Sequence, residues 1–294
     1  MAPELTFNEL KAQLDNKIHH HNKTPVADFC GLSPEQLANW LYAPFHELQS
    51  VTVDTPQELS TSPVMRYLAL ILDEAMSNGG SFKATSKGNL PAKLVKQACD
   101  LLPEFAVAEL HIPPSINEYM GSNEDKFNAL HYARVLAELA GVIYRRAGRF
   151  HVKKQVQKQY QAHGVQAFFK PMLEAAISKY NWGYFDLFEY DIDLSPLWLL
   201  MLWRLQHHAS VTRLVEELIS AFPELLCAQP TEDYFSPKKK LSLLIETRFI
   251  ERCLQFWGFV ILDPRGRFDE QAAPRGVQVQ QLFTDAFRFT NFLV

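Results

Sequence analysis

Over most of the chain, hydrophobic positions recur at helical spacing, and short apolar runs bounded by glycine interrupt them. The clearest example is the stretch FNALHYARVLAELAGVIYRRAGRFHVKKQVQKQY, residues 127–160. Apolar residues from Phe127 to Leu139 predict a helix that Gly141 ends. Two apolar runs on either side of Ala147–Gly148 predict a β-hairpin, and a second helix follows. This order is typical of the end of a winged-helix unit.

Capping residues place several other helix starts. Thr6 with Glu9 can form a capping box before a periodic run, and Ser33-Pro34 with Gln36 can form a second one. The Ser-Pro pair recurs three more times, each time before an apolar periodic run, at Ser62-Pro63, Ser195-Pro196 and Ser236-Pro237. Each serine is predicted to be an N-cap that stabilises its helix by about 1 kcal/mol.

The sequence predicts three copies of a helix followed by a short hairpin. A strand at 81–85 and a turn at 87–89 follow the helix that starts at Pro63, and a strand at 258–261 follows the helix that ends at Trp257. The second and third copies share a string: Gly141-Val-Ile before Gly148-Arg-Phe, and Gly258-Phe-Val before Gly266-Arg-Phe. We therefore predict a mainly α fold with short β-hairpins (α+β), built from tandem winged-helix-like modules.

These signals divide the chain into four predicted parts. Residues 1–62 form an N-terminal helical segment, and 63–121 form a first winged-helix-like module. Residues 122–180 form a second module with a basic wing, and 181–294 form a helical region that ends in a third module. The segment 180–194 alternates aromatic and acidic residues and predicts a strand or an ordered loop.

Composition narrows the class of protein. The 294 residues are 47% hydrophobic and 12% aromatic, which excludes a disordered chain. The N-terminus carries acids and no apolar signal region, and the longest apolar run, 197–203, spans only about 10 Å as a helix. Four separated cysteines predict reduced thiols rather than a disulfide framework or a zinc site. We expect a cytoplasmic protein without a membrane segment, a metal or a cofactor.

The charge distribution is uneven although the net charge is only −4. No Asp or Glu lies between Glu138 and Glu174 or between Glu74 and Asp100, and these stretches hold 11 of the 29 basic residues. The other 18 basic residues stand against all 33 acidic ones, a balance of −15. The candidate partner-binding residues on the two predicted wings and the helix after the second are Lys83, Lys87, Arg145, Arg146, Arg149, Lys153, Lys154 and Lys158. Such residues commonly contact phosphates.

An alternative interpretation is that these residues are only the solvated side chains of exposed turns, or that the modules dock proteins. The helix before the second wing mixes both signs, with Asp125, Lys126, His131, Arg134 and Glu138. Mixed signs make a poor reader of the major groove.

Catalytic signatures are missing from the sequence. No phosphate loop, nucleotide-binding glycine fingerprint, nucleophile elbow or HExxH motif occurs. The acidic residues Asp186, Glu189, Asp191 and Asp193 are predicted to form a solvated edge rather than a cation site. His207 and His208 are predicted to be surface or core histidines, since Glu216 and Glu217 lie two to three turns away on a continuous helix.

Three strings carry a resemblance: GLSPEQLANWLYAPF (31–45), FKATSKGNLP (82–91) and YNWGYFD (180–186). Together they resemble a group of uncharacterised bacterial proteins that share a GLSP-E/Q helix start, a K-L-T-x-x-GNLP turn and an NWGYFD segment. Ala84 stands where that group usually has Leu, and 151–154 (HVKK) departs from the L-T-x-x-G string of related proteins. The resemblance implies no activity and no site residue.

From the sequence we expect a non-catalytic interaction or regulatory protein, whose partner is a protein or a nucleic acid held by the basic wings. A nucleic-acid-binding protein that uses these wings on phosphates is the first alternative, and an enzyme of unknown class is the second.

Overall fold

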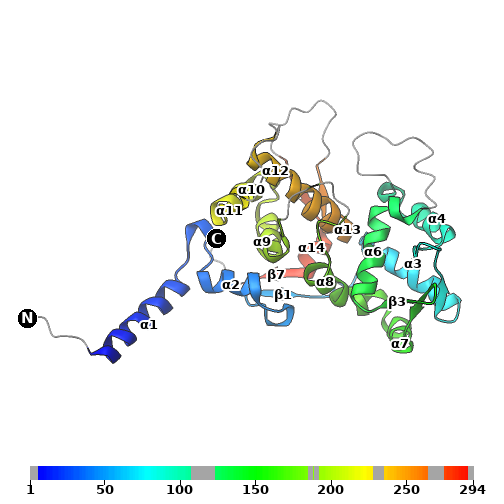
Figure 1. Cartoon of the computed structure of the whole chain (residues 1–294), viewed down its shortest axis with the longest axis horizontal. Coiled ribbons are helices and arrows are strands. Elements are labelled where there is room, and N and C mark those ends of the chain that lie inside the picture. The colour runs from blue at the N-terminus through cyan, green and yellow to red at the C-terminus, as the bar shows by residue number, and fades with distance from the viewer. Residues whose placement is uncertain are drawn as a thin grey trace, which may run out of the picture.

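The structure is a computed structural model, and it describes residues 6–106, 123–184, 188, 192–227, 235–263 and 275–290. Over these residues the chain is mainly helical with short antiparallel strands, as predicted (Figure 1). The described α-helices are α1 (Phe7–Lys23), α2 (Pro34–Tyr42), α3 (Pro63–Ser77), α4 (Ala92–Leu101), α6 (Asn128–Leu139), α7 (Lys154–His163), α8 (Phe169–Ser178), α9 (Trp198–His208), α10 (Val211–Ala221), α11 (Glu224–Cys227), α12 (Pro237–Ile245), α13 (Gln255–Trp257) and α14 (Gln281–Ala286). The described strands are β1 (Val51–Val53), β2 (Ser81–Lys83), β3 (Ile143–Arg146), β4 (Arg149–Val152), β5 (Val260–Leu262), β6 (Val277–Val279) and β7 (Phe287–Phe289). No helix in these ranges is both long and apolar enough to span a bilayer.

Helix starts follow the capping signals at three of the predicted sites. The side chains of Thr6 and Ser33 accept from the backbone N–H groups of Glu9 and Gln36, and both capping boxes are complete. Ser236 caps α12 through the N–H of Lys239. These interactions fix where α1, α2 and α12 begin.

The two other Ser-Pro sites differ from the prediction. Ser62 precedes α3 but its side chain makes no capping hydrogen bond. Ser195 is not an N-cap, because it is the first residue of a 3-10 turn, Ser195–Leu197, that leads into α9. The N–H of Ser195 instead donates to Oδ1 of Asp193 at 2.9 Å, so an aspartate two residues earlier satisfies the free donor.

The first half of the body contains, in order, α3, β2, α4, α6, β3 and β4. The hairpin β3–β4 forms around the predicted turn, where Ala147 and Gly148 both have positive φ. Strand β2 does not form a hairpin of its own, so the first predicted wing is wrong in this respect. Instead, β2 pairs antiparallel with β4, with Phe82 opposite Phe150, which gives a three-stranded sheet in the order β2-β4-β3. The turn after β2 leads directly into α4 and supplies no second strand.

The second half repeats this order with α9, α10, a long third helix, β5 and β6. The third helix runs from Pro237 to Trp257 through α12, a π-helical segment (Glu246–Leu254) and α13. An isolated antiparallel bridge joins Ser210, between α9 and α10, to Gly276, next to β6. Among the described residues the order of elements therefore occurs twice, and the first two predicted copies are one unit. The predicted turn at Gly266 lies outside the described residues.

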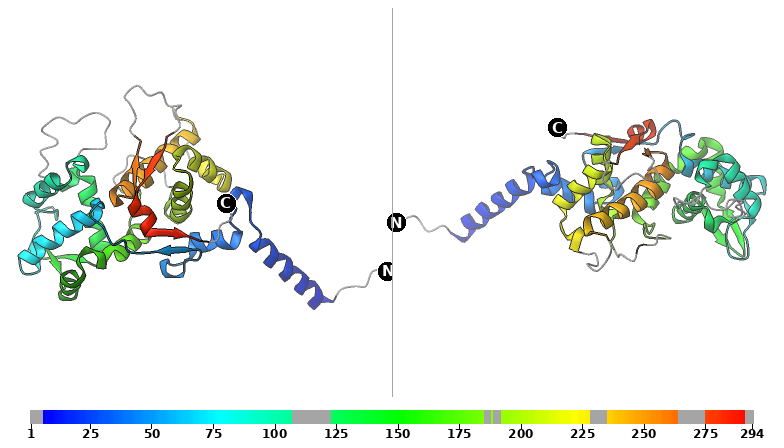
Figure 2. Two further views of the ribbon diagram at one scale, coloured as in Figure 1. Left: turned by 180° about the vertical axis from the view of Figure 1, so that it is seen from behind. Right: turned by 90° about the horizontal axis from the view of Figure 1, so that it is seen from above.

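The N-terminal segment after α1 packs against the C-terminal half. Strand β1 pairs antiparallel with β7, with Val51 opposite Phe289. The ring of Trp40 on α2 lies 5.5 Å from that of Trp203 and 5.7 Å from that of Phe289. Helix α1 itself extends away from the body, at the end opposite to β3 (Figures 1 and 2).

The two halves share one hydrophobic core. Helix α6, the third helix of the first half, meets the helix 237–257, the third helix of the second half, in this core. Tyr132 on α6 is buried, and its ring lies 5.6 Å from that of Phe256. Gly258, with φ +76°, follows α13, and it lies so close to Thr61 that a Cβ at this position would collide with the Thr61 backbone. Helix α6 packs mainly against α3 and α8, and none of its twelve residues is exposed.

Candidate functional site

The three-stranded sheet has one buried face and one solvent-facing face. Phe82, Phe150, Ile143 and Val152 point into the core. Because side chains alternate along a strand, Arg145, opposite Phe150, lies on this same face at the sheet edge, and the other positions of β2, β4 and β3 point outward. These outward residues are Ser81, Lys83, Tyr144, Arg146, Arg149 and His151, and we call them the cationic sheet face.

Three cations lie in one row across this face. Lys83 is directly opposite Arg149, and Arg149 is directly opposite Arg146. The guanidinium of Arg149 donates from Nη2 to the carbonyl oxygen of Ser81 at 3.0 Å and to its Oγ at 3.1 Å. All three side chains are exposed. The predicted candidates Lys83, Arg146 and Arg149 thus lie in one row, although Lys83 and Arg146 are 63 positions apart (146 − 83) and were predicted in different modules.

Arg145 and Lys87 lie at the edge of the sheet rather than on its outer face. Nη1 of Arg145 donates to the carbonyl oxygen of Gly88 at 3.1 Å, which holds the arginine against the turn after β2. Gly88 has φ +85°, which favours glycine in this turn, and a Cβ there would displace the Arg145 guanidinium. Lys87 is exposed in the same turn.

The remaining candidates begin helix α7. Lys153 is its N-cap residue, without a side-chain capping bond, and no acidic residue lies in the first turn. Lys153, Lys154 and Lys158 are exposed. Cations at a helix N-terminus oppose the helix dipole, and like charges four residues apart repel one another. The start of α7 is therefore an electrostatically unfavourable arrangement for the isolated chain.

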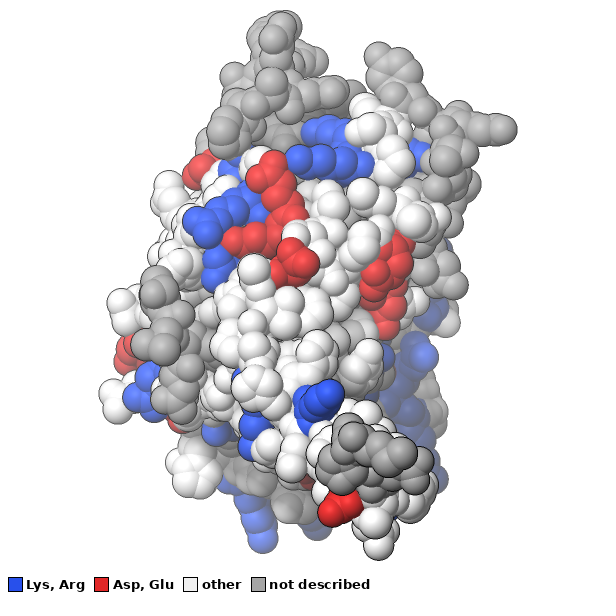
Figure 3. Space-filling view, turned by 90° about the vertical axis from the view of Figure 1, so that its left-hand side faces the viewer, with Lys and Arg blue, Asp and Glu red and all other residues white. Residues whose placement is uncertain are grey.

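None of the eight predicted cations forms an ion pair with a carboxylate in the part of the chain that the structure describes. The surface at the other end of the molecule, where α1 lies, carries Lys/Arg and Asp/Glu side by side (Figure 3). An unpaired group of cations at one end of an anionic chain is a surface suited to binding an anion.

Two aromatic rings lie next to the cation row. Tyr144 on β3 is directly opposite His151 on β4, and their rings stack with centroids 5.2 Å apart and an interplanar angle of 19°. Nε2 of His151 lies 3.3 Å from the carbonyl oxygen of Arg146, which fixes the orientation of the imidazole. Neither ring was among the residues predicted to bind a partner. Their alternation with Arg146 and Arg149 along the two strands was the signal that could have identified them.

The polar residues of α6 do not contribute to an exposed surface. His131 and Arg134 are buried, and each contacts Oε1 of Glu124 at 2.8 Å. Glu124 is itself fully buried and also accepts from the N–H of Leu90. Burial alone would raise the pKa of Glu124, but the hydrogen bond from His131 and the charge of Arg134 lower it below its ordinary value. This network ties α6 to the segment before α4.

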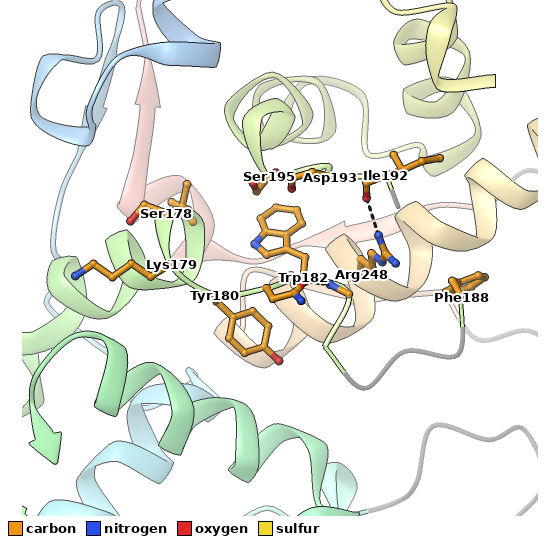
Figure 4. A pocket seen from close by; sticks show the side chains of 12 residues that line it. Ser178, Lys179, Tyr180, Trp182, Phe188, Ile192, Asp193, Ser195 and Arg248 are labelled. Carbon is orange, nitrogen blue, oxygen red and sulfur yellow. Dashed lines mark hydrogen bonds between the residues drawn. The ribbon is translucent and has the colours of Figure 1, made fainter. Parts of the chain in front are cut away.

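A cavity of about 620 Å³ lies beside Trp182 and Arg248 (Figure 4). Nη1 of Arg248 donates to the carbonyl oxygen of Ile192 at 2.6 Å, and Asp193 accepts from Ser195. Lys179 is the third charged residue in the described lining, and its Nζ donates to the carbonyl oxygen of Leu139 at 3.3 Å, so all three charged groups have hydrogen bonds to backbone atoms. The predicted acidic residues Asp186, Glu189 and Asp191 lie outside the described residues. Within the described ranges no cluster of three or more His, Cys, Asp or Glu side chains could hold a metal.

His208 and Glu217 meet, contrary to the expectation from a continuous helix. Ala209, with φ +56°, separates α9 from α10, and Nε2 of His208 lies 3.0 Å from Oε2 of Glu217. Nε and Nη2 of Arg204 each donate to the same carboxylate at 2.8 Å. The N–H of Ser210 donates to Nδ1 of His208, so this histidine donates from Nε2 and joins a buried ion-pair network rather than a ligand set.

A second cavity, of about 790 Å³, lies between the two halves. Leu102 and Phe105 line it from the first half, and Phe256 and Ile261 line it from the second.

In comparisons with known proteins, no family model, no curated protein and no solved structure matched the chain.

Proposed function

We propose that this chain is a non-catalytic interaction protein made of two winged-helix domains, and that its partner is a nucleic acid held through its phosphates by the cationic wing of the first domain. The observation that carries the proposal is the group of eight exposed Lys and Arg residues on β2, the β3–β4 hairpin and the start of α7, which lack carboxylate partners among the described residues.

The assignment of winged-helix domains rests on topology. Each half has a helix, a strand or bridge, two helices and a pair of antiparallel strands. In each half the first strand or bridge lies next to the last strand, as in β2 with β4 and Ser210 with Gly276. A glycine with positive φ ends each third helix, Gly141 in one half and Gly258 in the other. These shared features support two copies of one domain type.

Base reading by a third helix is not part of this proposal. In helix-turn-helix proteins the recognition helix lies in the major groove, which requires an exposed face. Helix α6 has no fully exposed residue, and in the helix 237–257 only Lys238 is fully exposed. The proposed contacts are therefore electrostatic and independent of sequence, which is the mode that phosphate-binding Lys and Arg support.

The second half differs from the first in its wing. The outward pair on β5 and β6 is Ile261 opposite Gln278, and neither is charged. We therefore assign nucleic-acid binding to the first domain, and we assign to the second a structural role in covering α6.

A protein partner is the second candidate function, and two observations favour it. Helix α1 exposes the apolar residues Phe7, Leu10, Leu14 and Ile18, and the cavity between the halves is lined partly by apolar side chains. An enzyme is the least supported class, because the described charged residues that line the cavity beside Arg248 each hydrogen-bond to backbone atoms.

The test is fluorescence anisotropy with labelled duplex and single-stranded probes at two salt concentrations. If about three phosphates are contacted, raising salt fourfold weakens binding roughly 40-fold. The triple variant Arg145→Ala, Arg146→Ala, Arg149→Ala should lose most of the affinity. The control variant Lys11→Ala, Lys17→Ala, Lys23→Ala removes three exposed cations from α1 and should bind like the wild type. Absence of binding to both probes at low salt defeats the proposal and favours a protein partner.

A further inference from the structure

Among the described residues, the cation row of the sheet has no acidic partner, although Arg149 hydrogen-bonds to Ser81. Like charges directly opposite one another in neighbouring strands destabilise a sheet, by up to about 1 kcal/mol per pair. Here Lys83, Arg149 and Arg146 occupy consecutive directly opposite positions, and no described carboxylate pairs with them. An arrangement that opposes folding and lacks an internal counter-ion indicates that an external anion occupies it.

The row of outward residues next to the cation row is made of a hydroxyl and two aromatic side chains. One step of alternation away, Ser81, His151 and Tyr144 are aligned across the same three strands. The His151 ring covers one side of the Tyr144 ring, and no other described ring stacks on Tyr144. Since β3 is at the edge of the sheet order β2-β4-β3, the other side of the tyrosine ring faces away from the sheet. Tyr144 is 38% exposed, a large fraction for an aromatic side chain in a strand.

We infer that the cationic sheet face binds single-stranded nucleic acid in preference to duplex, with one base stacked on Tyr144 and neighbouring phosphates on Arg149, Arg146 and Lys83. This inference rests on the proposed function and names the class of nucleic acid. His151, held by the carbonyl oxygen of Arg146, keeps the tyrosine ring in place to receive the base.

The spacing of the two rows fits a nucleotide. Outward residues two apart on one strand are about 7 Å apart, a distance that one nucleotide covers from phosphate to base. A strand of nucleic acid that crosses the sheet along the cation row would therefore present a base to the aromatic row. Lys153, the N-cap residue of α7, follows directly after β4 with an extended backbone and is exposed, so cations occur in the chain on both sides of His151.

Base stacking is what separates single strands from duplex. In a duplex the faces of the bases are already stacked on one another, whereas single strands present them to aromatic side chains. Stacking of a base on an aromatic residue contributes about 1–3 kcal/mol and tolerates any base. We therefore expect a preference for single strands without a strong preference for sequence.

The test uses the full chain with single-stranded oligo-dT and oligo-rU probes and a mixed duplex of equal length at one low salt concentration. The wild type is expected to bind the single strands about tenfold more tightly than the duplex. Tyr144→Leu should weaken single-strand binding about tenfold and leave duplex binding unchanged. Tyr144→Trp, which keeps a stacking surface, should retain the preference. Tyr42→Leu makes the same substitution at an exposed tyrosine of α2, which is not part of the sheet, and is the matched control.

The outcomes separate this inference from the proposed function. Equal affinity for single strands and duplex, unchanged by Tyr144→Leu, overturns the inference while the nucleic-acid function stands. Failure of every nucleic-acid probe overturns both, and binding of a poly-glutamate probe in their place would assign the face to an acidic protein. Thermal unfolding of each variant checks that it is folded. Binding is compared only between variants that unfold cooperatively, so a loss of binding by Tyr144→Leu then reports the lost stacking surface.

Discussion

Nε1 of Trp257 donates a hydrogen bond of 3.1 Å to the hydroxyl oxygen of Tyr132, and this bond joins the third helices of the two halves. Both residues are buried, and burial raises the pKa of the Tyr132 hydroxyl well above its ordinary value. The halves therefore share a polar contact inside their common core, where a donor without an acceptor is unfavourable.

We predict that Tyr132→Phe lowers the free energy of unfolding by about 1–3 kcal/mol, because it leaves the buried Trp257 N–H without its acceptor. Tyr132→Ala should cost about 3–5 kcal/mol, since it also opens a cavity. Urea denaturation followed by tryptophan fluorescence measures both. A single transition in the wild type is expected from the shared core. Two separate transitions, or an unchanged midpoint in Tyr132→Phe, would contradict this account.

Gly141 and Gly258 provide a matched pair for testing how closely the halves pack. Each follows a third helix with positive φ, +71° and +76°, where alanine is strained. A Cβ at Gly141 meets open space, whereas a Cβ at Gly258 would collide with the carbonyl oxygen of Thr61. We expect Gly141→Ala to cost about 1–2 kcal/mol and Gly258→Ala at least about 1 kcal/mol more. Equal losses in chemical denaturation would show that this approach is not close in solution.

Much of the fold follows from local signals. The capping boxes at Thr6 and Ser33, the helix end at Gly141 and the β3–β4 hairpin depend on residues within a few positions of one another, and the structure has them where the sequence predicts them. The eight cations were likewise found from an interval without acids, because exposure of charged residues in a turn is the general rule.

The long-range pairings could not be predicted in the same way. Strands β2, β1 and β7 have three residues each, too few for a periodic pattern to identify their partners. The partner of β2 lies in β4, beyond α4, α6 and β3, so the sequence indicated a separate wing. In the sequence, His131 and Arg134 are only part of the mixed charges on a possible groove-reading helix, and nothing in it indicates that Glu124, on another element, compensates their burial.

Glu217 gives the protein a defined response to acid. Burial alone would raise its pKa, but hydrogen bonds from His208 and Arg204 lower the pKa of Glu217 to about 2. The folded state therefore binds fewer protons than the unfolded state between this value and the ordinary value of 4.5. The stabilisation is complete above pH 4.5 and is lost as the pH falls toward 2.

We predict that Glu217→Gln lowers the free energy of unfolding at pH 7 by about 1–3 kcal/mol, because it leaves the buried Arg204 without its carboxylate. The difference from the wild type should shrink as the pH falls below 4.5. Glu216→Gln is the control: among the described residues Glu216 forms its one ion pair with exposed Lys238, and such pairs contribute at most about 1 kcal/mol. Denaturation curves at several pH values measure the effect, and a difference that stays constant down to pH 3 would refute the assignment to Glu217.

Helix α1 forms without burying any side chain, so its contribution to stability should be small. None of its residues is buried, and its apolar stripe is open to solvent, with Phe7 80% and Ile18 49% exposed. We expect deletion of residues 1–23 to change the free energy of unfolding by less than about 0.5 kcal/mol. The comparison is Trp40→Ala on α2, which should cost about 3–5 kcal/mol because Trp40 is 2% exposed and packs against Trp203. Thermal unfolding at two protein concentrations measures both. A large, concentration-dependent loss on deleting α1 would mean that its apolar stripe is buried against another copy of the chain in solution.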